Sequence, residues 1–339
     1  MNILGIETSC DETAAAVVAD GQRLLSNVVV SQIDIHQAYG GVVPEIAARS
    51  HIEAILPVID KAVTPVGWDA IDAIAVTNQP GLLGSLLIGT LTARTLALTH
   101  RKPLLGIHHI KSHIYANWLG DQTPTFPALA LVVSGGHTQI LFLKSHTDFQ
   151  IIGTTRDDAV GEAFDKVAKI LGLPYPGGPS ISKAAISGNP RAYLLPHPKV
   201  DGYDFSFSGL KTAVLRSIQQ TVDKPISFPS SQLAELLTQQ QVADFAASFE
   251  ATAVAVLVEK LAKAVENYQP KSLLLAGGVA ANQKLRAECA KIAPKIQFFV
   301  PAPQFSTDNA AMVASAAYFE HQNGKSYDDP FSLTANPTK

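Results

Sequence analysis

Residues 128–138 read Ala-Leu-Ala-Leu-Val-Val-Ser-Gly-Gly-His-Thr, an apolar run that fits one buried strand followed by a tight glycine turn. The chain opens in the same way, since residues 3–13 read Ile-Leu-Gly-Ile-Glu-Thr-Ser-Cys-Asp-Glu-Thr. After each stretch the pattern indicates two more strands, at 14–19 and 24–31 in the first half and at 139–144 and 149–155 in the second. This repetition predicts two halves built on one plan.

Each half is then expected to continue with helices and a further strand. In the first half these are a helix at 44–62, a strand at 70–77 and an apolar helix at 81–98. In the second they are helices at 161–171 and 178–187, a long amphipathic stretch at 233–265, a strand at 272–276 and a helix after the glycine turn that follows it. The pattern predicts an α/β fold with a mixed sheet in each half and a ligand cleft between the halves.

We expect the first lobe to cover residues 1–126 and the second lobe to cover 127–327, with its last helix at 308–321. The segment 189–229 is rich in Pro, Ser and Gly and is expected to be irregular. The tail 328–339 is expected to be loosely held.

Composition limits the class of protein. With 339 residues, of which 47% are hydrophobic and 16% charged, the chain suits two folded domains. Two cysteines, Cys10 and Cys289, exclude a disulfide framework and fit a reducing cytoplasm, and Cys10 is interpreted as an inert rather than a reactive thiol. The net charge of −3 gives no general sign of nucleic-acid binding, so an RNA substrate would need a local basic patch or a partner protein.

No segment is interpreted as a membrane anchor. Residues 1–6 lack the basic stretch and apolar run of a signal peptide. The most apolar segment, 81–98, contains Arg94 and several hydroxyl groups, which favours a helix buried in a soluble core. Its Gly and Ala content also suits close packing against a partner chain, and the sequence leaves both roles open.

Two histidines, His109 and His113, are spaced to share one face of a helix, where two imidazoles can bind one metal ion. The zinc-protease motif has the same spacing with a general-base Glu after the first His, but here that position is Ile110. The sequence therefore offers half a metal site without a group that activates water. Ordinary surface or capping chemistry is the alternative interpretation.

Three acidic residues are candidates for the same chemistry. Asp11 and Glu12 follow the first strand and can hold a cation or a polar substrate, or form a solvated turn. Asp308 precedes a predicted helix at 310–320 and can either cap it or complete the metal site. Two His and one Asp form a familiar ligand set for iron or zinc.

Three turns follow strands and expose backbone amides, at residues 8–12, 134–137 and 277–279. Such turns can be purely structural, but glycine amides at helix starts also bind phosphate. The sequence has no P-loop, and no complete Gly-x-Gly-x-x-Gly follows a strand, which argues against dinucleotide chemistry. The three turns together favour a nucleotide or an acyl-phosphate as ligand.

In this order the motifs closely resemble those of the bacterial TsaD family, the tRNA threonylcarbamoyladenosine transferases. The resemblance covers essentially the whole chain, from Gly5-Ile-Glu-Thr-Ser-Cys-Asp-Glu-Thr13 to Ser306-Thr-Asp-Asn-Ala310. The matching segments between them are 44–51, 79–85, 133–137, 161–165, 175–179, 205–211 and 277–282. One departure is Ser112, where the family has Gly or Ala; because serine is small, we expect little effect.

The resemblance implies the ASKHA fold of actin, Hsp70 and sugar kinases, with two duplicated RNase H-like lobes. It implies one divalent metal per subunit, Fe²⁺ or Zn²⁺, bound by His109, His113 and Asp308. Asp11 and Glu12 would lie near the reacting group. The implied adenylate and substrate contacts are Val133, Ser134, Gly135, Gly136, His137, Asp165, Gly178 and Asn282.

The implied reaction moves a threonylcarbamoyl group from threonylcarbamoyl-AMP to the exocyclic amine of the adenosine 3′ of the anticodon, in tRNAs that read codons starting with A. The implied partners are a paralogous subunit, TsaB, and an ATPase, TsaE, with a homodimer as the alternative when they are absent. The expected location is the cytoplasm. The rival hypotheses are a kinase or ATPase of the same fold, a metalloendopeptidase, and a non-catalytic scaffold.

Overall fold

The computed structural model describes residues 1–292 and 294–338, which separate into two compact units. The first unit contains residues 1–125, the turn 144–149 and the chain from Phe299 onward, and the second contains 126–143 and 150–298. The sequence placed the last helix in a second lobe that runs to residue 327. That helix instead belongs to the first unit, because it packs on the first sheet.

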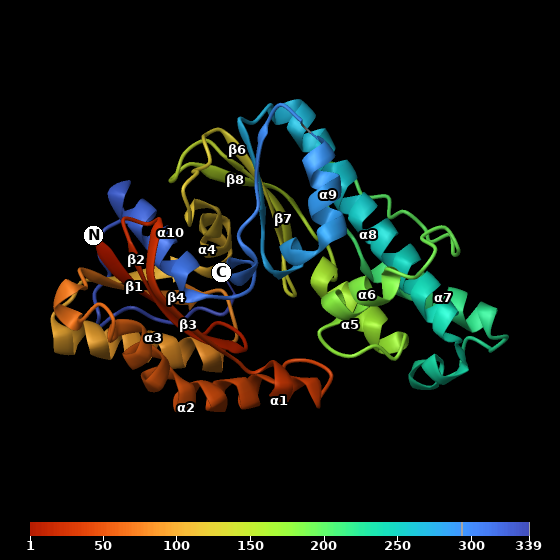
Figure 1. The fold of residues 1–339 in the computed structure, drawn as a ribbon, viewed down its shortest axis with the longest axis horizontal. Coiled ribbons are helices and arrows are strands. Elements are labelled where there is room, and N and C mark those ends of the chain that lie inside the picture. The colour runs from red at the N-terminus through yellow and green to blue at the C-terminus, as the bar shows by residue number, and fades with distance from the viewer. Residues whose placement is uncertain (293, 339) are drawn as a thin grey trace. The chain divides into compact units, whose positions relative to one another are not determined.

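The first unit is built on a five-stranded mixed sheet in the order β3-β2-β1-β4-β5 (Figure 1). Strands β1 (Asn2–Glu7), β2 (Glu12–Ala19) and β3 (Arg23–Ser31) form an antiparallel meander. Strand β4 (Ala73–Gln79) runs parallel to β1, and β5 (Leu104–His108) runs parallel to β4. The predicted strands are confirmed, and β5 is one that the sequence analysis missed.

Helices cover both faces of this sheet. Helices α2 (Pro44–Val63) and α3 (Leu83–His100) lie along one face, and α10 (Ala310–Gln322) lies on the other (Figure 1). Side chains alternate along β1, so that Leu4 and Ile6 join the core with α2 and α3. Gly5 faces α10, where a Cβ would lie 2.2 Å from the Ala310 carbonyl oxygen. Only glycine allows α10 to approach β1 this closely.

Short helical segments complete the first unit. They are α1 (Ile33–Gln37), α4 (His109–Tyr115) and the single turns Trp68–Ala70, Ala116–Trp118 and Pro303–Phe305. Helix α4 follows β5 without a loop, so the edge strand of the sheet fixes where α4 begins.

The second unit repeats the plan of the first, with strand order β10-β9-β6-β7-β8. Strand β6 pairs antiparallel with β7 and parallel with β9, just as β1 pairs with β2 and β4. This correspondence confirms the predicted duplication. The strands are β6 (Ala128–Val133), β7 (Thr138–Leu143), β8 (Phe149–Thr154), β9 (Ser272–Ala276) and β10 (Gln297–Phe299).

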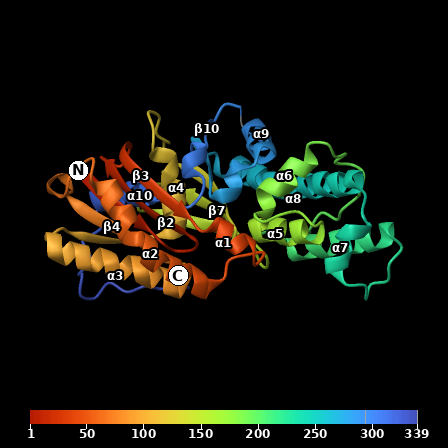
Figure 2. The same ribbon diagram turned by 60° about the horizontal axis from the view of Figure 1, so that its bottom comes forward.

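Helices form the other layer of the second unit (Figure 2). They are α5 (Val160–Ile170), α6 (Gly177–Ala185), α7 (Ser208–Thr221), α8 (Gln239–Tyr268) and α9 (Gln283–Ile292), with short turns at Ser230–Gln232, Ala234–Leu236 and Gly278–Ala281. Among the described helices, α8 alone is long and apolar enough to cross a membrane, but 61% of its apolar window is buried. That burial is typical of the core helix of a soluble protein.

The structure contradicts two expectations from sequence, one for the segment 189–229 and one for the tail. The segment 189–229 is not irregular throughout, because it contains α7, which buries Leu210, Val214 and Ile218 on one face. The Asp157 carboxylate accepts hydrogen bonds from the backbone of Phe207 and Ser208 and so closes the start of this helix.

The described part of the tail, residues 328–338, is not loosely held either. The Asp328 backbone N–H donates to the Leu104 carbonyl of β5, and the Gly106 N–H donates to the Asp328 carboxylate. Leu333 is only 8% exposed and packs into the core of the first unit. Further along, the Asn336 N–H donates to the Asn78 carbonyl. The tail therefore covers the free edge of β5.

Candidate metal centre and substrate-binding turns

Strand β5 ends at His108, and helix α4 begins with the next residue, His109. The His108 side chain caps the helix by accepting a hydrogen bond from the Ile110 N–H. His109 and His113 are separated by one helical turn, and both are buried. Ser112 donates its hydroxyl to the His108 carbonyl, so the departure from Gly or Ala at this position is satisfied within the helix.

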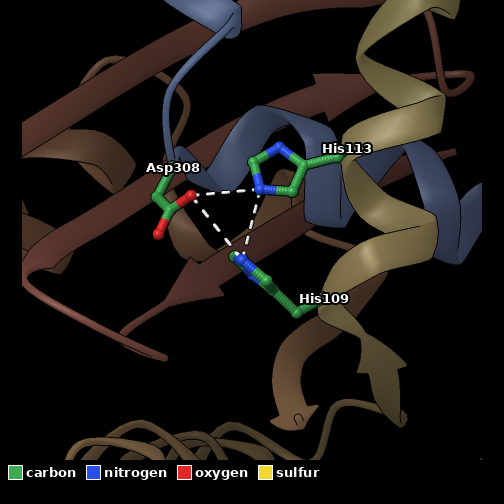
Figure 3. A group of neighbouring side chains, drawn as sticks. All are labelled: His109, His113 and Asp308. Carbon is green, nitrogen blue, oxygen red and sulfur yellow. Dashed lines mark hydrogen bonds and ion pairs between the residues drawn. The ribbon is translucent and has the colours of Figure 1, made fainter. Parts of the chain in front are cut away.

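Asp308 reaches the same point from the loop before α10 (Figure 3). Its Oδ1 lies 3.1 Å from His113 Nε2 and 3.6 Å from His109 Nε2, and the two Nε2 atoms are 3.2 Å apart. Two ligand atoms of a tetrahedral metal are roughly 3.3 Å apart when each bond is about 2.05 Å. The three atoms therefore converge with the spacing that one metal ion needs. Among the described residues this is the only such cluster.

The capping interpretation of Asp308 does not hold. Asn309 is the N-cap of α10, and its side chain accepts a hydrogen bond from the Met312 N–H at 3.0 Å. The Asp308 carboxylate, with 19% of its side chain exposed, is thereby left to face the two imidazoles.

A second carboxylate contacts His109 from the opposite side. Glu7, at the end of β1, lies with Oε2 3.1 Å from His109 Nδ1. Burial opposes a charge on His109, but the carboxylates of Asp308 and Glu7 raise its pKa to about 9. Burial also acts to raise the pKa of Glu7, yet the neighbouring His109 holds that pKa below its usual value. The pair is therefore ionised in the absence of metal.

Asp11 and Glu12 lie in the same unit, at the turn between β1 and β2. Burial, and then the negative charges of Asp308 and Asp11, raise the pKa of Glu12 well above its usual value. Burial and Asp11 likewise raise the pKa of the Cys10 thiol, which disfavours a reactive thiolate. The structure thus places Glu12 in the electrostatic environment of Asp308.

The predicted substrate residues group together in the second unit. The β6–β7 turn is closed by the Ser134 N–H donating to the His137 carbonyl and the His137 N–H donating to Ser134 Oγ. Gly135 and Gly136 at its tip are exposed. A Cβ on Gly161 would lie 2.5 Å from the Ser134 carbonyl oxygen, so the start of α5 packs directly against this turn.

The glycine turn after β9 closes on the same strand end. Gly277 has a φ of +87°, and a Cβ there would lie 2.4 Å from the Val133 carbonyl oxygen. Two turns that are far apart in sequence therefore meet at the end of β6, where ligands of such sheets bind.

The remaining predicted residues are linked to this region through α5 and α6. The Asp165 carboxylate accepts a hydrogen bond from the Gly177 N–H at 2.6 Å, which sets Gly178 at the start of α6. Asn282 donates its side-chain amide to Ser182 and Glu250 and accepts from the Leu285 N–H. Any substrate contact by the Asn282 side chain would use Oδ1, since both amide hydrogens are already donated.

Sequence reasoning missed Glu7, Thr77 and Glu250. Glu7 is the one charged residue of β1 and has no exposed surface, and Glu250 is 6% exposed within α8. A single acidic residue in an otherwise apolar strand or helix face could have indicated these two glutamates. A buried carboxylate needs hydrogen-bond partners, so its presence predicts polar groups around it.

The residue that follows the first histidine ligand argues against peptide hydrolysis by a zinc-protease mechanism. Position 110 is a buried isoleucine, and Glu7 contacts His109 through Nδ1, on the side of the ring away from Asp308 and His113. The described part of this cluster therefore lacks the glutamate that a zinc protease uses to activate water.

Comparison with known proteins places this geometry in a family. The family described as "TsaD: tRNA N6-adenosine threonylcarbamoyltransferase" matches residues 23–315. The chain is 51% identical to the tRNA N6-adenosine threonylcarbamoyltransferase of Thermomicrobium roseum, covering 96% of this chain and 93% of the relative. It is 50% identical to the protein of the same name from Geobacillus kaustophilus, covering 99% and 96%.

Solved structures of lower identity share the fold. HypF from T. kodakarensis superposes with a TM-score of 0.62 at 13% identity, over 95% of this chain and 48% of HypF. Component A of (R)-2-hydroxyglutaryl-CoA dehydratase from Acidaminococcus fermentans superposes with a TM-score of 0.50 at 14% identity, over 95% and 99%. With the duplicated sheets, these likenesses confirm the ASKHA fold. The chain belongs to the TsaD family of tRNA N6-adenosine threonylcarbamoyltransferases, and its reaction is transfer of a threonylcarbamoyl group to N6 of an adenosine in tRNA.

Proposed function

We propose that the donor is threonylcarbamoyl-AMP and that the acceptor is the adenosine directly 3′ of the anticodon in tRNAs reading codons that start with A. The acceptor N6 forms a bond to the carbamoyl carbon, the bond from that carbon to the phosphate oxygen breaks, and AMP leaves with the electron pair. The observation that carries the proposal is the His109–His113–Asp308 cluster, combined with the family membership of the chain.

This chemistry calls for positioning more than for a protein nucleophile. AMP is a good leaving group, whereas N6 is a poor nucleophile because its lone pair is delocalised into the ring. Glycine amides at Gly135, Gly136 and Gly278 are assigned to phosphate and nucleoside, together with Val133, Ser134, His137, Asp165, Gly178 and Asn282. The unreactive Cys10 agrees with the absence of a covalent step.

The proton lost from N6 needs an acceptor. Glu12 and Asp11 are proposed for this role, and the raised pKa of Glu12 supports it because a group that binds a proton readily is suited to take one. An anticodon-loop base can be unstacked at low cost to reach such a group.

His109, His113 and Asp308 are proposed to hold one Fe²⁺ or Zn²⁺ ion per subunit. Two imidazoles and one carboxylate suit either metal, and three protein ligands leave coordination positions for a substrate. When bound, the metal supplies a Lewis acid that polarises the donor. The chain's own contribution is to keep both Nε2 atoms and Asp308 Oδ1 aimed at one point.

A paralogous subunit of the TsaB type and an ATPase of the TsaE type are the proposed partners, with a homodimer when they are absent. Helix α3 supports a docking role, because Leu83, Leu87 and Leu91 recur every fourth residue and are 40–51% exposed. The half-exposed apolar residues of α3 and its neighbour α2 are Ile52, Leu56, Leu83, Leu87, Leu91 and Leu98. Leu86, Ala93 and Ala97 on the opposite side are buried, so α3 serves the core as well.

The reaction is tested by incubating the chain and its partners with unmodified tRNA, ATP, bicarbonate, labelled threonine and the enzyme that makes threonylcarbamoyl-AMP, in a cytoplasmic buffer. We expect label in tRNA, located by nuclease digestion to the adenosine 3′ of the anticodon. Unlabelled tRNA under complete conditions would overturn the proposal. The double variant His109→Ala, His113→Ala should lose both bound metal and most transfer, whereas His100→Ala, on α3, should retain them.

A further inference from the structure

Glu7 is a charged residue in the most enclosed part of the first sheet. It ends β1, which lies between β2 and β4, and its side chain has no exposed surface. A carboxylate in such a place is strongly destabilising unless its oxygens accept hydrogen bonds. Its partners therefore show what it is held there to do.

Three groups from three elements meet this carboxylate. The Ser9 N–H donates to Oε1 at 2.6 Å, and the Thr77 hydroxyl of β4 donates to Oε2 at 2.6 Å. His109 of α4 approaches the same Oε2 with Nδ1 at 3.1 Å. The Ser9 N–H follows the end of β1 and the Thr77 hydroxyl belongs to β4, so both donors are held by the sheet. They fix the position of the Glu7 carboxylate, which in turn orients the His109 imidazole.

This contact decides which ring nitrogen keeps its hydrogen when the imidazole of His109 binds a metal. An ionised carboxylate can only accept, so His109 Nδ1 must be the donor. When His109 gives up a proton to bind a metal, the hydrogen on Nδ1 stays against Glu7, and the Nε2 lone pair is freed on the side that faces His113 Nε2 and Asp308 Oδ1. Ser9 Oγ, also 3.1 Å from Nδ1, can share the same hydrogen.

His113 lacks this support. Its Nδ1 is buried and has no hydrogen-bond partner among the described residues. The two imidazoles of the cluster are thus held in different ways, and only His109 is oriented by a carboxylate on its far side.

We infer that Glu7 is a positioning residue that fixes the tautomer and direction of His109 for metal binding. The inference rests on the metal site proposed above. It predicts that the cluster loses affinity for metal when the carboxylate is replaced, although Glu7 itself touches neither the metal position nor Asp308. Partners of this kind typically change metal affinity by about 10- to 100-fold.

The test is the Zn²⁺ affinity of the full chain, measured by competition with a chromophoric chelator. In Glu7→Gln the amide must place its NH₂ group either against the Ser9 N–H or toward His109, where it would donate to Nδ1 and move the ring hydrogen to Nε2. We expect Zn²⁺ to bind 10- to 100-fold more weakly. The visible absorption spectrum of bound Co²⁺ should also change.

Thr77→Val is the matched control. It removes a donor to the same carboxylate and leaves the His109 contact in place. We expect its Zn²⁺ affinity to stay within about threefold of the unaltered chain and its Co²⁺ spectrum to be unchanged, a difference from Glu7→Gln that a general packing defect would not produce.

The outcomes separate the two proposals. If the unaltered chain binds no Zn²⁺, the metal site itself is wrong. If it binds Zn²⁺ and Glu7→Gln binds equally well, the role of Glu7 is wrong. Should Glu7→Gln not fold, nitrogen NMR of the unaltered chain loaded with ¹¹³Cd²⁺ decides, because cadmium coupling at His109 Nε2 with hydrogen on Nδ1 supports the inference and the reverse arrangement overturns it.

Discussion

His109 lies between Glu7 and Asp308, and this placement gives the metal-free protein a defined response to pH. Its pKa is about 9 in the folded chain, against 6.5 for an unperturbed histidine. A raised pKa contributes stability that is full below pH 6.5 and is lost as the pH rises through about 9. In chelator-treated protein we expect the melting temperature to fall over this window, as measured by calorimetry.

His109→Asn provides the comparison for that experiment. Glu12, whose pKa is also raised, shifts stability in the same direction, so only the difference between the two proteins isolates His109. The variant should melt with a shallower dependence on pH between 6.5 and 9. An identical slope in both proteins would show that the two carboxylates do not control this group.

At the residue scale, the sequence could predict the histidines but not their surroundings. The spacing of His109 and His113 indicates a shared helix face, and resemblance to the family adds Asp308. The choice between Asp308 and Asn309 as the helix cap depends on backbone geometry that neither side chain reveals. Glu7 was missed because an acid at the end of a strand looks solvated until the neighbouring strands are known.

Glycines allow some elements to pack in close backbone contact. The contact at Gly277, between the turn after β9 and the end of β6, can be tested by substitution. Gly277→Ala would place a methyl group 2.4 Å from the Val133 carbonyl oxygen and also strain a φ of +87°. We expect a loss of more than about 2 kcal/mol in the free energy of unfolding, measured in urea. The matched control is Gly67→Ala, with a φ of +82° and no atom within 4 Å in the described part of the chain.

The control carries the strain of a positive φ without the clash, so its loss should be only about 1 kcal/mol. The additional loss in the free energy of unfolding for Gly277→Ala, relative to Gly67→Ala, measures the packing of the turn after β9 against the end of β6. Equal losses at the two positions would mean that the turn is free to move away.

At the scale of elements, long apolar runs were predictable and short or mixed ones were not. Strands β1, β6 and β9 follow directly from continuous apolar residues that a central strand needs. Strand β5 has only five residues and runs straight into α4, so its pattern merged with the histidine segment. Helix α7 was hidden by the Pro- and Gly-rich sequence around it, although three apolar residues repeat every fourth position.

In the molecule as a whole, the tail takes part in the core of the first unit, and Leu333 is the residue that tests this. Leu333 is 8% exposed, so we expect Leu333→Ala to lower the free energy of unfolding by about 2–4 kcal/mol in urea denaturation. Phe331, two residues earlier, is 74% exposed and provides the control. Phe331→Ala should change stability by less than about 0.5 kcal/mol, and similar small effects at both positions would mean that the tail is dispensable.

The exposed leucines of α3 predict where a partner subunit binds. Leu87 and Leu91 are 40% and 51% exposed, so an arginine at either position can remain in water in the isolated chain. If this face docks the TsaB-type paralog, Leu87→Arg with Leu91→Arg should weaken the complex at least about tenfold in sedimentation or calorimetry. Leu194→Arg, at a leucine that is 95% exposed in the second unit, should not.

The duplication could be predicted from sequence, but the sequence did not show that the residues from Phe299 onward fold back into the first unit. The two sheets repeat because the same succession of strands and turns occurs twice. Helix α10 is nearly uniformly buried, with few polar residues to mark an outer face, and nothing local in its sequence says which sheet it covers. Its partner is decided by Gly5, more than three hundred residues earlier, which leaves room for it.

The position of Asp308 so late in the chain sets the order of events during synthesis. A ribosome releases β1, the two histidines and then the entire second unit before it releases Asp308 and α10. Until then one face of the first sheet lacks its covering helix, and the cluster has two nitrogens but no carboxylate. The three-ligand site is therefore complete only after Asp308 and α10 have joined the first unit.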